Sequence, residues 1–173
     1  NGEVDEIDSQ EASIYFKKLS IKGNLDGMAL YARYIRIYGG SEAERKLAVK
    51  YAKTAAEKGN VEGMYQYARI LLDSCFVPIN KKEGIRYLKK AVDNEHMNAL
   101  EIYASMIKKG EIPSVNKEES NRYYKKLIPI IKKEIDNGNA NAMNIYGLML
   151  ENGNGVEVNL KEACRYYKMA ADK

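Results

Sequence analysis

Few residues in this chain have the types and spacing that catalysis requires. The single histidine, His96, lies in a predicted turn beside Glu95. The two cysteines, Cys75 and Cys164, have no histidine at a spacing that would create a thiol nucleophile, and they form no CxxC metal-binding pair. The many carboxylates occupy predicted helix caps and solvated faces, with no evident desolvated pair. We therefore expect no catalytic residues, no metal site and no enzyme.

One glycine-rich segment, Asn152–Gly155, resembles in composition the loops that bind phosphate groups. The Lys-Ser/Thr pair that completes a phosphate-binding loop does not follow it. We interpret the segment as a connecting loop and expect no cofactor.

Charge and composition exclude further classes of function. The net charge is +4, with 28 basic and 24 acidic residues mixed along the same predicted helices, whereas a nucleic-acid binder concentrates Lys and Arg on one face. No apolar run reaches transmembrane length. The few cysteines and the absence of an Asn-x-Ser/Thr sequence favour a reducing, cytoplasmic location. Because residue 1 is Asn1 and not Met, we expect a fragment from which a leader or another domain is missing.

Tyrosines recur along the chain with steps of 36 residues and one final step of 43. They form two series: Tyr15, Tyr51, Tyr87, Tyr123 and Tyr166, and Tyr31, Tyr67, Tyr103 and Tyr146. A period of this length is typical of stacked two-helix units. We therefore predict an all-α fold, a right-handed superhelix of antiparallel helix pairs (an α-solenoid). At helical spacing the tyrosines are expected to lie in the core and not on a ligand-stacking surface.

The first helix of each unit, called helix A, has a small residue, then Met or Leu, then Tyr, then Ala or Gly. The instances are Gly27–Ala32, Gly63–Ala68, Ala99–Ala104 and Ala142–Gly147. Offsets of three, four and seven residues place these side chains on one face of a helix. The small residue beside Tyr allows a neighbouring helix to approach closely.

The second helix, helix B, begins with a capping residue followed three positions later by Glu. The instances are Asp8–Glu11, Ser41–Glu44, Asn80–Glu83, Asn116–Glu119 and Asn159–Glu162. Since Ser41 lies one turn earlier than its equivalents, we expect a longer helix there.

Helix B ends in Gly-Asn turns in which Gly adopts the left-handed conformation and Asn caps the next helix A. These turns are Gly23-Asn24, Gly59-Asn60 and Gly138-Asn139. Glu95-His96 replaces the pair in one unit and predicts a less regular turn. The extra seven residues before Gly138 are about two helical turns, so with Pro129 they predict a long, kinked helix over roughly 118–136.

Residues Ala142–Val156 and Asn159–Ala171 closely resemble the two halves of a Sel1-like repeat. The resemblance implies an α-solenoid scaffold for protein–protein contacts. We expect a single domain over 1–173, with a helix B of a partial unit at 8–22, repeats at about 24–59, 60–95 and 96–138, and a last unit at 139–173.

The resemblance also implies a binding surface, because in related superhelices the outward face of helix A lines the concave groove. Residues one, five, eight and nine positions after the Met or Leu are expected to point outward, away from the core. The candidate partner-binding residues are Arg33, Arg36, Tyr65, Arg69, Glu101, Lys108, Asn144 and Leu148. Arg33, Arg69 and Lys108 are expected to receive acidic groups of an extended peptide. The alternative is that they are ordinary surface charges.

The sequence thus predicts a non-catalytic scaffold or adaptor for a protein or peptide partner, with no nucleic acid and no membrane involved. A second interpretation is a self-associating regulatory or structural segment of a larger protein, attached to a catalytic domain such as a kinase. Self-association would use exposed terminal repeats. A third is a binder of small molecules or peptidoglycan fragments, which a deep polar pocket would favour.

Overall fold

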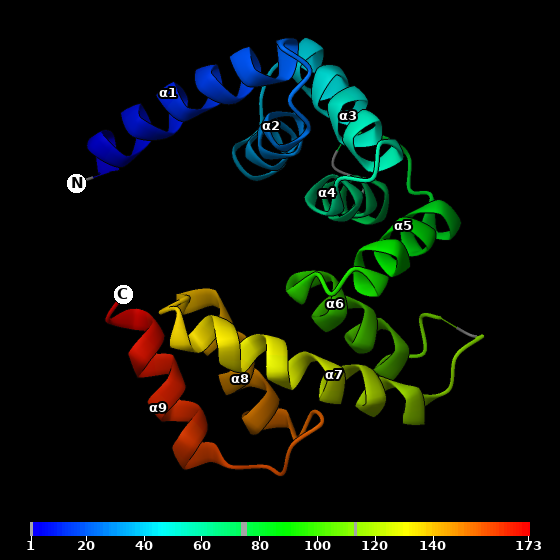
Figure 1. Ribbon diagram of the computed structural model, residues 1–173, viewed down its shortest axis with the longest axis vertical. Helices are drawn as coiled ribbons and strands as arrows, with labels where there is room; N and C mark the ends of the chain where they lie inside the picture. Colours follow the sequence, from blue (N-terminus) through cyan, green and yellow to red (C-terminus); the bar gives the residue numbers. More distant parts are fainter. Residues whose placement is uncertain (1, 74–75, 113) are drawn as a thin grey trace. The chain divides into compact units, whose positions relative to one another are not determined.

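The structure, a computed structural model, describes residues 2–73, 76–112 and 114–173, and all regular elements in them are α-helices (Figure 1). Side chains are described from Glu11 onward, with the exception of Lys117. The helices are α1 Gly2–Ile21, α2 Leu25–Tyr38, α3 Glu42–Glu57, α4 Val61–Asp73, α5 Lys81–Asp93, α6 Met97–Lys108, α7 Lys117–Asp136, α8 Ala140–Asn152 and α9 Leu160–Ala171.

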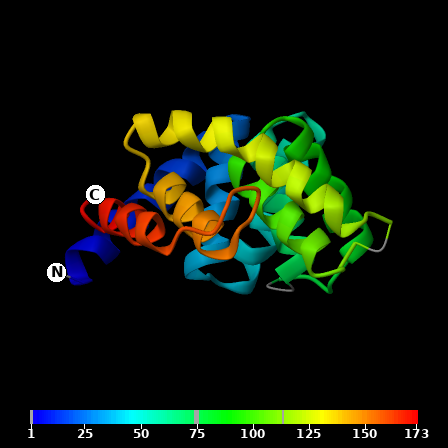
Figure 2. The same cartoon turned by 90° about the horizontal axis from the view of Figure 1, so that it is seen from below.

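The helices fall into two compact units, which divide between His96 and Met97. In the first unit each helix contacts the next one along the chain, and α2 also contacts α4. In the second unit α6 contacts α7, and α8 contacts both α7 and α9 (Figure 2). The even-numbered helices are the predicted A helices and the odd-numbered helices are the predicted B helices.

A tyrosine pair joins the two helices of each A–B pair. The ring centroids lie 4.9–5.7 Å apart and the planes meet at 76–89°, an edge-to-face geometry that aromatic rings prefer. The pairs are Tyr31–Tyr51, Tyr67–Tyr87, Tyr103–Tyr123 and Tyr146–Tyr166. The two series of tyrosines therefore face each other across every A–B pair, and the A-helix rings of the first three pairs are buried.

Tyr15 is the exception, and its predicted place in the core is wrong because its side chain is 63% exposed. Within the described residues no A helix precedes α1, so no helix covers this ring as α2 covers Tyr51. Lys18 Nζ lies over the ring of Tyr15, 5.4 Å from its centroid.

The predicted caps are confirmed where the side chains are described. Asn80, Asn116 and Asn159 each accept a hydrogen bond from the backbone N–H of the Glu three residues later, at 3.0–3.2 Å. Ser41 and Glu44 form a reciprocal capping box, and α3, with 16 residues, is longer than α5 and α9. The expected helix start at Asp8 is wrong, since α1 already begins at Gly2.

The turns from helix B to helix A also follow the prediction. Gly23, Gly59 and Gly138 have φ values of 78–89°, and the Asn after each one caps the next helix A. The expected irregularity at Glu95-His96 is wrong. Glu95 takes the left-handed conformation with φ 58°, and the His96 N–H donates to Ala91 O as the Asn60 N–H donates to Ala55 O.

Replacing Glu95 with glycine should raise the free energy of unfolding by about 1 kcal/mol, because an L side chain in the left-handed region costs energy that glycine avoids. Gly59→Glu, at the equivalent turn of the preceding repeat, is the matched control. It should destabilise by a similar amount, since a Cβ at Gly59 meets no atom within 4 Å and only the backbone is affected. Urea unfolding followed by circular dichroism measures both changes, and equal stability of Glu95→Gly and the parent would contradict the expectation.

The long helix before Gly138 is confirmed, because α7 continues from Lys117 to Asp136 with Pro129 inside it. The kink at Pro129 stays a prediction. No helix within the described residues has both the length and the apolar character needed to cross a membrane.

Candidate functional site

A chain of polar contacts joins α2 to α4 on the predicted binding face. Arg36 of α2 donates from Nε to Gln66 Oε1 of α4 at 3.0 Å, and its Nη1 lies 4.0 Å from Asp73 Oδ2. Arg69 donates to the same Asp73 oxygen from Nε at 2.8 Å and lies 2.7 Å from it through Nη2. One carboxylate therefore serves two arginines on neighbouring repeats.

The expected binding residues differ widely in exposure. Arg33, Lys108, Asn144 and Leu148 are exposed, whereas Glu101 is half-buried. The side chains of Arg36 and Arg69 are 14% and 26% exposed. Four of the eight candidates are therefore exposed, and one of these four, Lys108, donates a hydrogen bond to Asn154.

The outward orientation expected one position after the Met is wrong for Ala29 and Tyr65. Ala29 is fully buried, and α2, which carries it, packs against α4. Tyr65 is 6% exposed, because the His96 ring stacks on it with a centroid distance of 4.4 Å and Arg69 Nη1 donates to its hydroxyl at 3.2 Å. The position one residue after the Met therefore takes part in the packing between neighbouring repeats.

Asp73 explains why Arg69 is not equivalent to Arg33 in this structure. Burial acts to lower the pKa of Arg69, but the hydrogen bond that Arg69 donates to Asp73, together with the charges of Tyr65 and Asp73, outweighs burial and raises that pKa. The guanidinium is therefore held as part of an internal ion pair. Asp73 lies nine positions after Met64, on the face expected to point outward, and its four-residue spacing from Arg69 is typical of helical ion pairs. Gln66 was missed.

His96 has a structural place beside Glu62. Its Nε2 lies 2.9 Å from Glu62 Oε2, and its side chain is 14% exposed. Asn60 donates to Asp26 at 2.7 Å across the same 34-residue separation. His96 thus replaces asparagine as the side chain that links one helix A start to the previous one.

Burial acts to raise the pKa of Glu62, but the hydrogen bonds from His96 and Gln66, together with the charges of His96 and Arg33, outweigh it and lower that pKa below 4.5. A carboxylate with a lowered pKa stabilises the fold above its unfolded pKa, and this stabilisation is lost as the pH falls through the folded value.

We therefore predict that acid destabilises the protein less steeply below pH 4.5 when Glu62 is replaced by glutamine. The test compares the urea concentration at the unfolding midpoint of the parent with that of Glu62→Gln, from pH 6 down to pH 3. Glu57→Gln is the control, because the Glu57 side chain is 53% exposed and has a single lysine at 3.9 Å. If the unfolding midpoint falls equally steeply with decreasing pH in the parent and in Glu62→Gln, the prediction is contradicted.

In the second unit the glycine-rich loop is tied to α6. Lys108 Nζ donates to Asn154 Oδ1 at 2.6 Å, and Asn141 Nδ2 donates to Asn98 Oδ1 at 2.8 Å. Tyr167 donates to Glu151 Oε2 at 2.6 Å, and burial together with this bond raises the pKa of Tyr167 to about 12. Lys108 therefore contacts the glycine-rich connecting loop.

Metal chemistry gains no support from the described residues, among which no three His, Cys, Asp or Glu side chains gather as a metal ion would need. Cys164 is a free, exposed thiol. Cys75 lies outside the described residues.

The sequence profile of the Sel1 repeat matches residues 25–60, 61–96 and 140–173. The chain belongs to the Sel1 repeat family. The matched segments contain the pairs α2–α3, α4–α5 and α8–α9. Sel1 repeat proteins generally mediate protein–protein interactions and are typically non-catalytic helical scaffolds.

Solved Sel1 repeat structures have the same α-solenoid fold. A Sel1 repeat protein of Oxalobacter formigenes is 23% identical, with a TM-score of 0.62 over 95% of this chain and 64% of that one. A Klebsiella pneumoniae Sel1 repeat protein is 19% identical, with a TM-score of 0.59 over 97% of this chain and 80% of its own. A protective antigen of uropathogenic Escherichia coli with an SLR fold is 17% identical, with a TM-score of 0.53 over 92% of this chain and 40% of that one.

The chain thus spans less than two thirds of the Oxalobacter and Escherichia coli proteins. No curated protein matches it.

Proposed function

We propose that this chain is a non-catalytic scaffold that binds a peptide or domain of a partner protein on the outward face of its A helices. The observation that carries the proposal is the contrast between Arg33 and Arg69, two arginines 36 residues apart. Arg69 is paired with Asp73, whereas Arg33 is exposed and, among the described residues, its charge acts on Glu62 without a hydrogen bond or ion pair.

The intrahelical partner differs between the two positions. Four residues after Arg69 stands Asp73, while four residues after Arg33 stands Ile37. The guanidinium of Arg33 is therefore available to a carboxylate from outside the chain, and such charge-assisted bonds are stronger than neutral ones. An acidic group on the partner fits this position best.

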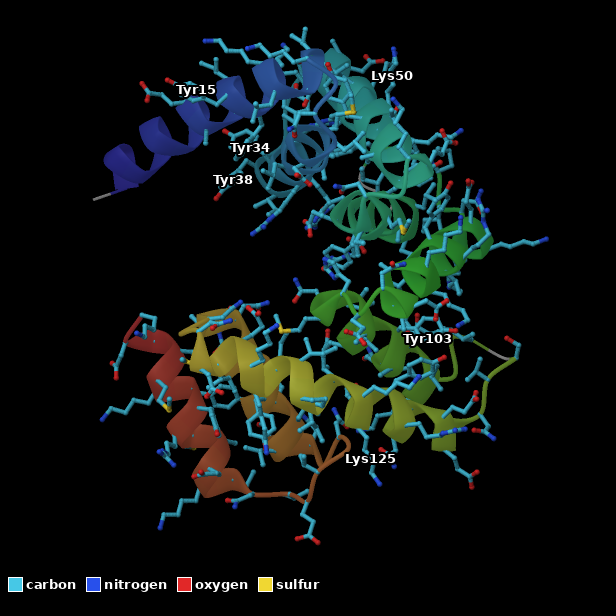
Figure 3. The ribbon with its side chains drawn as sticks, viewed as in Figure 1. Tyr15, Tyr34, Tyr38, Lys50, Tyr103 and Lys125 are labelled. Atoms are coloured by element: carbon cyan, nitrogen blue, oxygen red, sulfur yellow. The ribbon has the colours of Figure 1, made fainter. Side chains whose placement is uncertain are left out.

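Peptides selected from a display library enriched in Asp and Glu provide the probe. Arg33→Glu should weaken binding of the selected peptides about tenfold or more, because a hydrogen bond to a charged group contributes about 1.5–3 kcal/mol. Lys50→Glu, an exposed charge on the B helix α3, is the matched control and should bind like the parent (Figure 3). Unchanged affinity of Arg33→Glu would reject the proposal.

Self-association is a second candidate, and it rests on the outer face of α1. Ile14 and Ile21 are 54% and 70% exposed. One period later the same positions carry the charged residues Lys50 and Glu57. Light scattering at two concentrations tests this candidate, and a constant monomer mass excludes it.

A further inference from the structure

One stretch of α7 carries basic residues without acidic ones. Between Glu119 and Glu134 the sequence contains five basic residues, and no other interval between successive acidic residues contains as many. All five are exposed, and Lys125 extends from α7 into solvent (Figure 3). The five residues, called the basic stripe, are Arg122, Lys125, Lys126, Lys132 and Lys133. Basic and acidic residues are mixed along the chain as a whole, but not here.

The basic stripe occupies one face of α7. Its members follow Arg122 by three, four, ten and eleven residues, and these spacings return to the same side of an α-helix. The opposite side of α7 packs into the core, where Tyr124, Leu127 and Ile131 are 0–2% exposed. The helix therefore holds five cations on a fixed, solvent-facing surface.

The other B helices pair the equivalent cations with carboxylates of the same helix. These ion pairs, with N–O distances of 3.0–3.9 Å, are Lys53–Glu57, Lys89–Asp93 and Arg165–Glu162. Lys125 is the equivalent of Lys53 and Lys89, but the residue four positions after it is Pro129, which has no carboxylate. The local neutralisation of charge that the repeat provides elsewhere is missing on α7.

None of the five side chains forms an ion pair with a described residue. Lys126 Nζ lies over the Tyr123 ring, 5.7 Å from its centroid, and the charge of Lys132 acts on Tyr166 without a hydrogen bond. Carboxylates from outside the chain can therefore pair with the stripe without first displacing an internal partner.

Two carboxylates border the stripe and limit the width of what can bind to it. Glu119 lines a hollow of about 170 Å³ together with Arg122 and Lys126. Glu157, in the loop before α9, lines a hollow of about 270 Å³ together with Lys125. A broad anionic surface, such as a lipid bilayer or a DNA duplex, would bring its negative charges against both carboxylates. A single acidic polypeptide is narrow enough to avoid them.

We propose that the basic stripe of α7 binds an acidic segment of a partner protein. The segment lies along α7 and pairs its carboxylates with Arg122 and Lys126 at one end and with Lys132 and Lys133 at the other. The helix rises about 16 Å from Arg122 to Lys133, a length that about five residues of extended chain cover. This surface is on a B helix, so it does not depend on the binding proposed for the A helices.

The probe is a fluorescein-labelled peptide of alternating Asp and Ser, and a labelled peptide of alternating Asn and Ser is its neutral control. Fluorescence anisotropy with the full chain should show that only the acidic peptide binds. Its affinity should fall as the salt concentration rises, because salt screens exposed charges. No binding of the acidic peptide, or equal affinity of the two peptides, would overturn the proposal.

Charge reversal at matched positions tests whether α7 is the binding surface. Arg122→Glu with Lys125→Glu should weaken the acidic peptide about tenfold or more, since attraction is lost and repulsion is added. Lys50→Glu with Lys53→Glu, the equivalent positions of α3, changes the net charge equally and should bind within about twofold of the parent. Equal losses in the two double variants would show attraction to net charge alone and would overturn the proposal.

A second variant tests the other end of the stripe. Lys132→Glu with Lys133→Glu should also weaken the acidic peptide, and unchanged affinity in both α7 variants would overturn the proposal. Far-ultraviolet circular dichroism should be the same for all variants and the parent, because the replaced side chains are exposed.

Arg33→Glu separates this surface from the A helices and should bind the peptide of alternating Asp and Ser like the parent. If Arg33→Glu loses this peptide while both α7 variants keep it, the stripe is rejected and the binding proposed for the A helices stands. If the α7 variants alone lose it, the stripe is supported whatever the A helices bind.

The other occupants are tested with the same α7 variants. Single-stranded DNA, and vesicles of phosphatidylcholine with phosphatidylserine, should bind more weakly than the acidic peptide. Tighter binding of either one that Arg122→Glu with Lys125→Glu abolishes would assign the stripe to that occupant and overturn the proposal. A dimer in light scattering that the same variant dissociates would assign it to a second copy of this chain.

Discussion

Replacing Tyr31 with alanine should lower the free energy of unfolding by about 3–5 kcal/mol, the loss typical of a large buried aromatic ring. Tyr31 is fully buried, and the change removes the edge-to-face contact with Tyr51 and leaves a cavity between α2 and α3. Urea unfolding followed by circular dichroism gives the difference.

Phenylalanine at the same position separates the ring from its hydroxyl. The Tyr31 hydroxyl is buried and has no hydrogen-bond partner among the described residues, and burial, followed by the Glu44 charge, raises its pKa above 10.0. An unsatisfied buried polar group costs about 1–3 kcal/mol, so Tyr31→Phe should keep or increase stability. A loss of more than about 1 kcal/mol in Tyr31→Phe would show that the hydroxyl is satisfied in solution.

Tyr15→Ala is the control from the same tyrosine repeat. Because its ring is 63% exposed, the change should stay within about 0.5 kcal/mol, as surface substitutions usually do. The three variants together test whether the A–B tyrosine pair, and not tyrosine content, stabilises each repeat.

The parts of this fold that the sequence predicts well are local and periodic. A cap such as Asn80 with Glu83, or a turn such as Gly59-Asn60, satisfies its own hydrogen bonds within a few residues. The tyrosine steps then repeat the same A–B contact along the chain. Caps, turns and the tyrosine spacing can therefore be recognised without knowing which other helices pack nearby.

The parts that it predicts poorly depend on neighbouring helices. The helical spacing on α4 places Tyr65 away from its own core, yet His96 from the following turn covers it. The same spacing assigns Tyr15 to a core that no A helix completes among the described residues. Helical periodicity identifies a face, but only packing shows whether that face is covered.

The proposed binding surface illustrates the same limit in electrostatic terms. Arg33 and Arg69 are identical in type and register, so the sequence pattern treats them alike. Asp73, four residues after Arg69, forms an ion pair with it, whereas Ile37, four residues after Arg33, offers no carboxylate. The distinction was accessible from the residue four positions further along each helix, which is where a helical ion pair forms.

Pro129→Ala should raise the free energy of unfolding by about 2–3 kcal/mol, because alanine is a far better residue than proline in a helix interior. Pro129 lies in the interior of α7, where its ring removes the hydrogen bond to the carbonyl of Lys125 and crowds that carbonyl. Its side chain is exposed, so little packing is lost with it. Pro129→Gly should gain about 1 kcal/mol less than alanine, because glycine is the weaker helix former.

The order Ala, Gly, Pro in stability, measured by urea unfolding, tests whether α7 is strained at this point. The segment around Pro129 is where the repeat is seven residues longer than elsewhere, so the helix must cross it without help from the 36-residue pattern. If Pro129→Ala is no more stable than the parent, α7 bends at the proline and its neighbours already accommodate the ring. Lys132→Ala, an exposed change one turn further along, should stay within about 0.5 kcal/mol and shows that a gain belongs to the proline alone.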